Sequence, residues 1–174
     1  MLSGELVRLR PMELNDAEAH WRWNHDPEVT EWMSTGYPVT FEQFSAGYAE
    51  RPRNGYEWLM LGIETRADNR LIGLVRLGDT DPETGGAELD VYIGEKDCWG
   101  KGFGTEATRL ICRYGFHKMR LHRIMLWVAD ANTAAIRVYQ KVGFIEEGRA
   151  RETLRHKGHW HDMILMGLLE GELR

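Results

Sequence analysis

Closely spaced glycines near the middle of the chain restrict most strongly what this sequence can fold into. Residues 99–105 read Trp-Gly-Lys-Gly-Phe-Gly-Thr; they follow a β-rich stretch at residues 87–93 and lead directly into an amphipathic helix. Glycines at alternate positions let backbone N–H groups turn toward one point, and the helix adds free N–H donors and the positive end of its dipole. The pattern predicts an anion site suited to a phosphate or pyrophosphate, with a glycine-rich turn that binds nothing as the alternative.

Two better-known phosphate loops do not fit this segment. A Walker A loop needs a longer glycine spacing that ends in Gly-Lys-Ser or Gly-Lys-Thr, and the chain contains none. A Rossmann fingerprint follows the first strand and needs a third glycine where Thr105 stands. The loop instead comes late in the chain, after several strands.

Length and composition predict one globular domain. The 174 residues are 43% hydrophobic and 28% charged, which is ordinary for a protein with a sizeable core, so we expect a single domain over residues 1–174. The chain begins without the basic and apolar segments of a signal peptide, and no stretch approaches the roughly 18 apolar residues that span a bilayer. Two cysteines, Cys98 and Cys112, are too few for a disulfide scaffold, so we expect free thiols and a cytoplasmic protein.

Charge and residue clusters argue against two other classes of partner. The net charge of −5 argues against broad nucleic-acid binding, which needs a basic surface, and is compatible with a cationic substrate such as an amine. His156, His159 and His161 lie close to Asp162 in the sequence, but they lack paired ligands at zinc-site spacing. They predict a surface turn and no metal site.

Hydrophobic periodicity predicts a mixed α and β chain with an antiparallel first half. Strands are expected at residues 6–10, 58–64, 71–77, 87–93, 123–128, 144–149 and 163–168. Helices are expected at residues 15–24, around Val29, Trp32 and Met33, at residues 42–48 after the cap Thr40, after the glycine loop with Ala107, Leu110, Ile111 and Tyr114 on one face, and at residues 133–141 before a stop at Gly143. Turns at residues 68–69 and 79–86 join three strands into an antiparallel meander, and a βαβα half follows.

Two blocks of the sequence resemble the GNAT N-acetyltransferase superfamily. Residues 87–107 are similar to its acetyl-CoA motif, and residues 132–144, Asn-Thr-Ala-Ala-Ile-Arg-Val-Tyr-Gln-Lys-Val-Gly-Phe, resemble its other signature at the expected distance. The opening Val-Arg-Leu-Arg-Pro at residues 7–11 and the ending at residues 147–162 are similar to the RimJ/RimL-type subgroup. That subgroup includes ribosomal-protein N-terminal acetyltransferases and spermidine acetyltransferases, and the resemblance covers essentially the whole chain.

The resemblance implies the GNAT fold, of class α+β: a mostly antiparallel twisted sheet of about seven strands with about four helices, and acetyl-CoA in a cleft between splayed central strands. The product would be coenzyme A. The positions that match the cofactor contacts of the family are Val91, Tyr92, Ile93, Trp99, Gly100, Lys101, Gly102, Phe103, Gly104, Thr105, Asn132, Ala135 and Tyr139. The family often has Arg or Gln in place of Trp99. Because its contacts there come largely from backbone amides, we expect cofactor binding to survive.

Four residues of the second block, Asn132, Ala135, Ile136 and Tyr139, fall on one face of the predicted helix. In the family, the tyrosine at position 139 donates a proton to the departing thiolate, and Asn132 would hydrogen-bond an amide of the pantetheine arm. A phenol suits the acid role because its reference pKa of about 10 keeps it protonated at neutral pH. The alternative is a half-buried aromatic side chain that packs on the sheet.

The attacking amine must be neutral, so the reaction calls for a base. Glu88 and Asp90 lie on one face of the predicted strand, and we expect Glu88, directly or through water, to be the base ahead of Asp90. Solvated strand carboxylates are the alternative. By family analogy, a backbone N–H near residues 91–93 would stabilise the oxyanion.

Aromatic and acidic residues near the N-terminus suggest where the acceptor amine binds. Cation–π contacts and carboxylates together suit a cationic amine, while core packing is the alternative role of the aromatics. The residues concerned are Trp21, Trp23, Trp32, Asp26, Glu28 and Glu31. We expect acceptor contacts from Trp32, Glu31 and Asp90.

The sequence thus predicts an acetyl-CoA-dependent transferase that acetylates a primary amine: a protein N-terminus, a polyamine or a small amine. A non-catalytic acyl-CoA sensor of the same fold is the competing class, and Tyr139 and Asn132 favour the enzyme. On family resemblance we also expect a homodimer.

Overall fold

Three consecutive antiparallel strands form the centre of the structure, as the sequence predicts. The computed structural model describes residues 2–33 and 36–174. Strands β3 (Trp58–Thr65), β4 (Leu71–Asp81) and β5 (Gly86–Ile93) pair in chain order. Asn69 has a φ of 55°, which a short polar side chain tolerates in a tight turn, so the predicted turn at residues 68–69 is confirmed.

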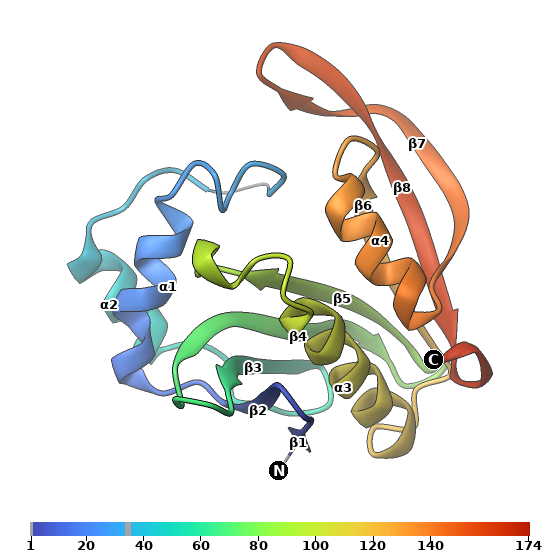
Figure 1. The fold of residues 1–174 in the computed structure, drawn as a ribbon, viewed down its shortest axis with the longest axis horizontal. Helices are drawn as coiled ribbons and strands as arrows, with labels where there is room; N and C mark the ends of the chain where they lie inside the picture. The colour runs from blue at the N-terminus through green and yellow to red at the C-terminus, as the bar shows by residue number, and fades with distance from the viewer. Residues whose placement is uncertain (1, 34–35) are drawn as a thin grey trace.

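The strands form one sheet of eight, in the order β1-β2-β3-β4-β5-β6-β8-β7 (Figure 1). About seven strands were expected, and the added one is the two-residue strand β1. The remaining strands are β1 (Leu2–Ser3), β2 (Val7–Pro11), β6 (Arg123–Ala129), β7 (Ile145–His156) and β8 (His159–Leu169). Among the described residues β5 and β6 form the one parallel pair, so the mixed, mostly antiparallel α+β class is confirmed.

The two central strands separate after a short paired section. β5 and β6 pair at Gly86–Arg123, Ala87–Ile124 and Glu88–Met125, and the register ends there. Both strands continue, β5 to Ile93 and β6 to Ala129. Each therefore presents backbone N–H and C=O groups to the other strand without a ladder partner, and such groups are free to bind a ligand. This divergence is the split that positions the candidate site.

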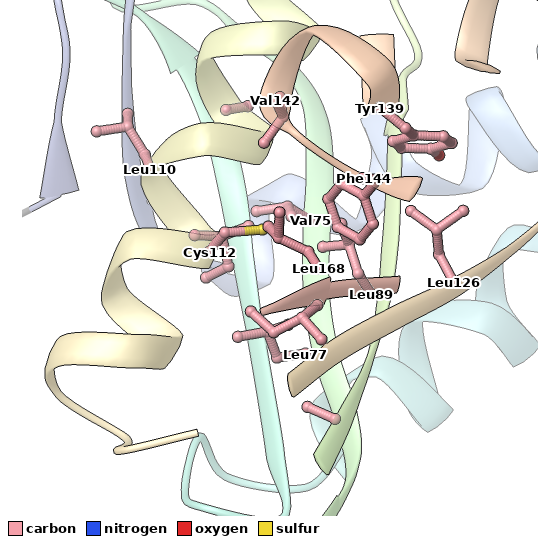
Figure 2. Close-up of a cluster of buried hydrophobic side chains, with 14 of the residues drawn as sticks. Val75, Leu77, Leu89, Leu110, Cys112, Leu126, Tyr139, Val142, Phe144 and Leu168 are labelled. Atoms are coloured by element: carbon pink, nitrogen blue, oxygen red, sulfur yellow. The ribbon is translucent and has the colours of Figure 1, made fainter. Parts of the chain in front are cut away.

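The α-helices lie on opposite faces of the sheet. α3 (Phe103–His117) and α4 (Thr133–Val142) cover one face, and Figure 2 shows their side chains Leu110, Cys112, Tyr139 and Val142 against strand residues such as Leu126. α1 (Ala17–Asn24) and α2 (Phe41–Ala49) lie on the other face, where Ala17 and Tyr48 form a smaller cluster with Met12. No helix within the described ranges is both long and apolar enough to cross a membrane.

Alternate residues of β5, β6 and β8 point to these two faces, because side chains alternate along a strand. We call the face under α3 and α4 the core face; there Leu89, Leu126 and Met166 are at most 3% exposed. We call the opposite face the outer face. Glu88, Asp90, Met125, Trp127, Met163 and Leu165 lie on it, and all of them are partly or largely exposed.

The helices agree with the sequence prediction, with one exception. Thr40 caps α2 by accepting a hydrogen bond from Gln43 N at 3.2 Å, as expected. The expected helix around Val29, Trp32 and Met33 is wrong: residues 27–33 form successive turns, in which Thr30 N and Met33 N donate to Asp26 O and Thr30 O at 3.0 Å each. A helix this short gains too few hydrogen bonds to offset the cost of its first turn. Residues 34 and 35 lie outside the described residues.

The closing hairpin is longer than its sequence pattern predicts. β7 and β8 remain paired out to His156–His159, far beyond the expected strand end at residue 149, and their tip extends past the rest of the sheet (Figure 1). The turn residues Lys157 and Gly158 have φ angles of 47° and 83°, as a two-residue hairpin turn requires. Strand pairing continues here without an apolar alternation, so the pattern gave no signal for it.

Candidate active site

The glycine loop after β5 turns its backbone amides outward. Gly100 and Gly102 have φ angles of 73° and 88°, a region that glycine occupies without the penalty of a Cβ atom. α3 begins at Phe103, no side chain caps it, and its first α-helical hydrogen bond runs from Glu106 N to Gly102 O at 3.0 Å. The amides of residues 103–105 therefore precede the ladder of α3 and are available to an anion, with exposed Lys101 beside them. These groups fit the pyrophosphate of the expected acetyl-CoA.

Trp99 ties the start of this loop to the end of β5. Its indole Nε1 donates a hydrogen bond of 2.8 Å to Ile93 O, while the ring itself stays 44% exposed. The side chain that departs from the usual family pattern thus supports the backbone of the loop and leaves its amides free. This observation supports the expectation that cofactor binding survives Trp99.

Two acidic residues that sequence reasoning missed hold the loop in place. Glu106, in the first turn of α3, accepts hydrogen bonds from the backbone N–H groups of Glu5, Leu6 and Val7 at 2.8, 2.8 and 2.7 Å. An acidic residue in the first turn of a helix is so common that its sequence position gave no signal for this contact.

The second, Glu95, lies directly after β5 and is 8% exposed. It accepts hydrogen bonds from Trp23 Nε1 at 2.9 Å and Arg22 Nη2 at 2.6 Å, and Arg70 also contacts it. Burial by itself would raise the pKa of Glu95, but these donors together hold its pKa below the usual value. Glu95 therefore joins α1 to the start of the loop.

Val91, Tyr92 and Ile93 line the split with their backbone, since β5 has no strand partner on the β6 side beyond Glu88. Val91 and Ile93 pack their side chains against the core under α3. The Tyr92 ring lies edge-on to Trp23, with centroids 6.1 Å apart, and burial raises the pKa of its phenol. These residues can therefore offer main-chain groups to a cofactor, while the side chain of Tyr92 belongs to the contact with α1.

Helix α4 begins beside the same split. Asn132 caps it, with Oδ1 accepting a hydrogen bond from Ala135 N at 3.2 Å. Because this oxygen already accepts a hydrogen bond within the helix, the hydrogen bond predicted between Asn132 and pantetheine would come from the side-chain amide nitrogen. Ala135 packs half-buried on the core, one turn along the face that leads to Tyr139.

Tyr139 lies two turns along α4, on the side of the helix that packs on the core. It is 7% exposed, and its ring lies edge-on to Phe144 with centroids 5.8 Å apart (Figure 2). Burial raises the pKa of the phenol well above its usual value, and the charge of Asp90 on β5 raises it further. Tyr139 is therefore protonated at neutral pH and lies within electrostatic reach of Asp90.

The two candidate base residues differ in their partners. Asp90 accepts a hydrogen bond from Arg76 Nε at 2.6 Å, and Arg76 in turn stacks over Trp58, 4.6 Å from the ring centroid. Glu88 has no hydrogen-bond or ion-pair partner in the described part of the chain, and burial, followed by the charges of Asp90 and Asp79, raises its pKa. A half-buried, unpaired carboxylate with a raised pKa suits a general base better than one held by an arginine.

The proposed aromatic pocket near the N-terminus is divided in the structure. Trp23 is 1% exposed and donates to Glu95, so core packing, the alternative role for this tryptophan, is confirmed. Asp26 and Glu28 lie 2.9 and 3.3 Å from Lys96 Nζ. Both carboxylates therefore already have a cation of this chain.

Glu31 and Trp32 instead meet the tip of the hairpin. Glu31 lies 2.7 Å from Lys157 Nζ, and the Trp32 ring lies 4.7 Å from His156 and 5.3 Å from His161, centroid to centroid. His161 lies two residues before Met163 on β8, so the two side chains share the outer face. Trp32 therefore packs at the edge of that face. Trp32, Glu31 and Asp90 thus border one face of the sheet without forming a single cluster.

Comparisons with known proteins agree with this architecture. A model of the acetyltransferase (GNAT) domain matches residues 7–145. The chain is 33% identical to the probable N-acetyltransferase YjcK of Bacillus subtilis, over 97% of each chain. It is also 33% identical to spermidine N(1)-acetyltransferase of Vibrio cholerae, over 95% of this chain and 94% of the relative.

The crystal structure of spermidine N-acetyltransferase from Vibrio cholerae in complex with CoA and spermine superposes with a TM-score of 0.85. The two chains are 26% identical, and the match covers 95% of this chain and 96% of that one. The family model covers well over half of the chain, and its relatives are named as N-acetyltransferases. The chain therefore belongs to the GNAT family of acetyltransferases.

Proposed function

We propose that this acetyltransferase moves the acetyl group of acetyl-CoA directly to a primary amine, with Glu88 as the base and Tyr139 as the acid. The proposal rests on the split between β5 and β6: Glu88 is the last paired residue of β5, and Tyr139 of α4 is buried in the core beneath the same strands, near enough to Asp90 for that charge to act on its phenol. The spermidine acetyltransferases among its relatives support an amine as the acceptor.

The residues of this chain divide the work by position. When bound, acetyl-CoA supplies the thioester. The amides and Lys101 of the glycine loop hold the pyrophosphate, and the backbone of residues 91–93 and the start of α4 line the pantetheine arm. These contacts fix the acetyl group relative to β5, which is the geometric part of the rate enhancement.

Two side chains transfer the protons: Glu88 on the outer face and Tyr139 in the core under α4. Glu88 removes one proton from the ammonium form of the acceptor, which gives a neutral amine able to form the C–N bond. Tyr139 gives its proton to the sulfur as the C–S bond breaks. The proton that nitrogen releases on amide formation restores the phenol. The products are the N-acetylated amine and coenzyme A, and Glu88 carries the one proton released overall.

Replacing Tyr139 with Phe tests the acid role. We expect kcat to fall about 100-fold, in the range usual for loss of a positioned acid, because sulfur would leave without a proton donor. The thermal stabilisation by acetyl-CoA should stay as in the parent, since the loop and the strand backbone are untouched. Free coenzyme A released with an amine acceptor is the readout.

A matched control is Tyr114→Phe. Tyr114 of α3 also packs half-buried on this core, so the variant removes a tyrosine hydroxyl outside the proposed site. It should leave kcat unchanged. Full activity in Tyr139→Phe would remove the acid role from the proposal.

The proposal also includes one acetyltransferase domain over residues 1–174, a cytoplasmic location and a homodimer. Cys98 and Cys112 are both buried free thiols, which suits the reducing cytosol. Light scattering at several concentrations measures the oligomeric state, and a monomer throughout would contradict the dimer.

A further inference from the structure

An apolar patch lies on the outer face next to Glu88. Met125 and Trp127 of β6 and Met163 and Leu165 of β8 form it; Trp127 pairs directly with Leu165, and Ala129 pairs with Met163 in the same register. None of the four belongs to either buried hydrophobic cluster, and Trp127 is 40% exposed. We call these four residues the Trp127 patch. Their strands already bury the core face, so folding does not require apolar side chains here.

The patch adjoins the proposed base. Glu88 pairs with Met125, and paired residues of neighbouring strands share a face at a spacing of about 5 Å. An amine bound at Glu88 can therefore extend its next few atoms over Met125 and Trp127. On the side of the patch away from Glu88, the residues of β7 that pair with Leu165 and Met163 are Gly148 and Ala150. These small residues leave the patch open toward β7.

The other carboxylates of the outer face and of residues 26–31 lie beside cations of this chain, which leaves little attraction for a second positive charge. Arg76 holds Asp90 and lies 3.9 Å from Asp79, and Asp26 and Glu28 lie beside Lys96. Glu31 lies beside Lys157. At the far end of β6 and β8, Asp130 and Asp162 lie 3.8 and 3.5 Å from Arg149. A polyamine, whose ammonium groups repeat every few carbon atoms, would have to displace these pairs and also lay a charge on the Trp127 patch.

We propose, on the basis of the proposed function above, that the acceptor is the α-amine of a peptide whose first side chain is apolar, and that the Trp127 patch recognises that side chain. An α-amine has a reference pKa near 8, about two units below that of an alkyl amine, so a single carboxylate is enough to deprotonate it. The open side along β7 leaves room for the rest of the peptide.

The test is a kinetic comparison of pentapeptides that differ only in the first residue, Leu, Ser or Asp, beside phenethylamine and spermidine. Coenzyme A release gives kcat/KM, and mass spectrometry locates the acetyl group on the α-amine. We expect the Leu peptide to exceed the Ser peptide by about tenfold or more, as burial of a few methylene groups allows. We expect it to exceed spermidine as well.

Variants of the patch complete the design. Trp127→Ala should reduce the Leu-over-Ser preference to less than about threefold, and Trp127→Phe should retain it. Trp160→Ala is the matched control, because Trp160 is another exposed tryptophan, outside the Trp127 patch and paired with Arg155 near the tip of the β7–β8 hairpin, and it should change nothing. Circular dichroism melting confirms that each variant is folded.

The outcomes separate this inference from the function on which it rests. Coenzyme A release with spermidine or phenethylamine above the peptides, equal rates for all peptides, or an unchanged preference in Trp127→Ala would overturn the recognition of an apolar first residue and leave the acetyltransferase proposal intact. Release with none of these amines would overturn both.

Discussion

The two faces of the sheet at β5, β6 and β8 use neighbouring residues of the same strands for opposite purposes. On the core face, Leu89 and Leu126 are 3% and 1% exposed and pack under α3 and α4. On the outer face, Glu88 and Met125 are half-buried, and Asp90 and Trp127 are exposed. One residue step along a strand therefore separates core packing from the carboxylates that we propose for catalysis and its surroundings, because side chains alternate between faces.

This difference between the two faces explains why the outer face tolerates polar and exposed groups. The core face supplies the free energy that holds the strands, so the outer face can keep an unpaired carboxylate and an exposed tryptophan at little cost to folding. Splitting β5 from β6 adds backbone groups without partners, and the neighbouring pairings, three between β5 and β6 and seven between β4 and β5, hold that opening in place.

The largest expected effect comes from replacing core-face and outer-face neighbours on β6. Leu126→Ala should lower the free energy of unfolding by about 2–5 kcal/mol, because it leaves a cavity under α4. Met125→Ala should lower it by about 1 kcal/mol or less, since its side chain is only partly buried. Urea unfolding measures both. Equal losses would mean that the two faces do not differ in this way.

A smaller effect is expected from removing the two outer-face carboxylates separately. Glu88→Gln should lower kcat/KM at neutral pH by about 100-fold and flatten the acidic limb of the pH profile, because that limb reports the free enzyme's base. The limb of the parent should lie above pH 4.5, the ordinary pKa of a glutamate, since the pKa of Glu88 is raised.

Asp90→Asn is the matched variant for this experiment. It keeps the shape of the side chain and removes a charge that Arg76 already neutralises, so kcat/KM should fall about threefold or less with the acidic limb retained. A profile that flattens in Asp90→Asn and persists in Glu88→Gln would exchange the two roles.

The smallest effect concerns stability. The pKa of Glu88 is raised in the folded state, so the folded protein binds its proton more tightly than the unfolded chain does. The ionised carboxylate thus opposes folding once the pH rises through the interval above 4.5. Glu88→Gln should melt about 1–2 °C above the parent at pH 7, a small shift because solvent screens a half-exposed group. The difference should vanish at pH 4, and a difference that grows toward low pH would contradict the raised pKa.

Local patterns predicted much of the fold and of the site. The meander, the glycine loop and the caps at Thr40 and Gly143 were predictable, because each depends on a few neighbouring residues. Gly143, for instance, has a φ of 118° at the end of α4, where glycine is the favoured residue. The Glu88–Asp90 pair was also placed on one face by alternation alone.

Contacts between distant segments were not predictable in the same way. Glu106 meets the amides of residues 5–7 across about 100 positions of sequence, and Glu95 meets Trp23 across 72. The sequence left two roles open for Trp23, ligand binding and core packing, because a sequence pattern does not show whether a tryptophan is exposed or buried. Only packing against Gly94 and Glu95 decides between them.

The sequence by itself determined the glycine loop, the helix with Tyr139 and the family, because glycine spacing, helix periodicity and two signature blocks are local properties of the chain. The tertiary structure alone decided that β5 and β6 part after Glu88, that Arg76 pairs with Asp90 while no described residue pairs with the Glu88 carboxylate, and that an apolar patch adjoins Glu88. These outcomes depend on strand register and burial, which arise only when segments far apart in the chain compete for the same neighbours.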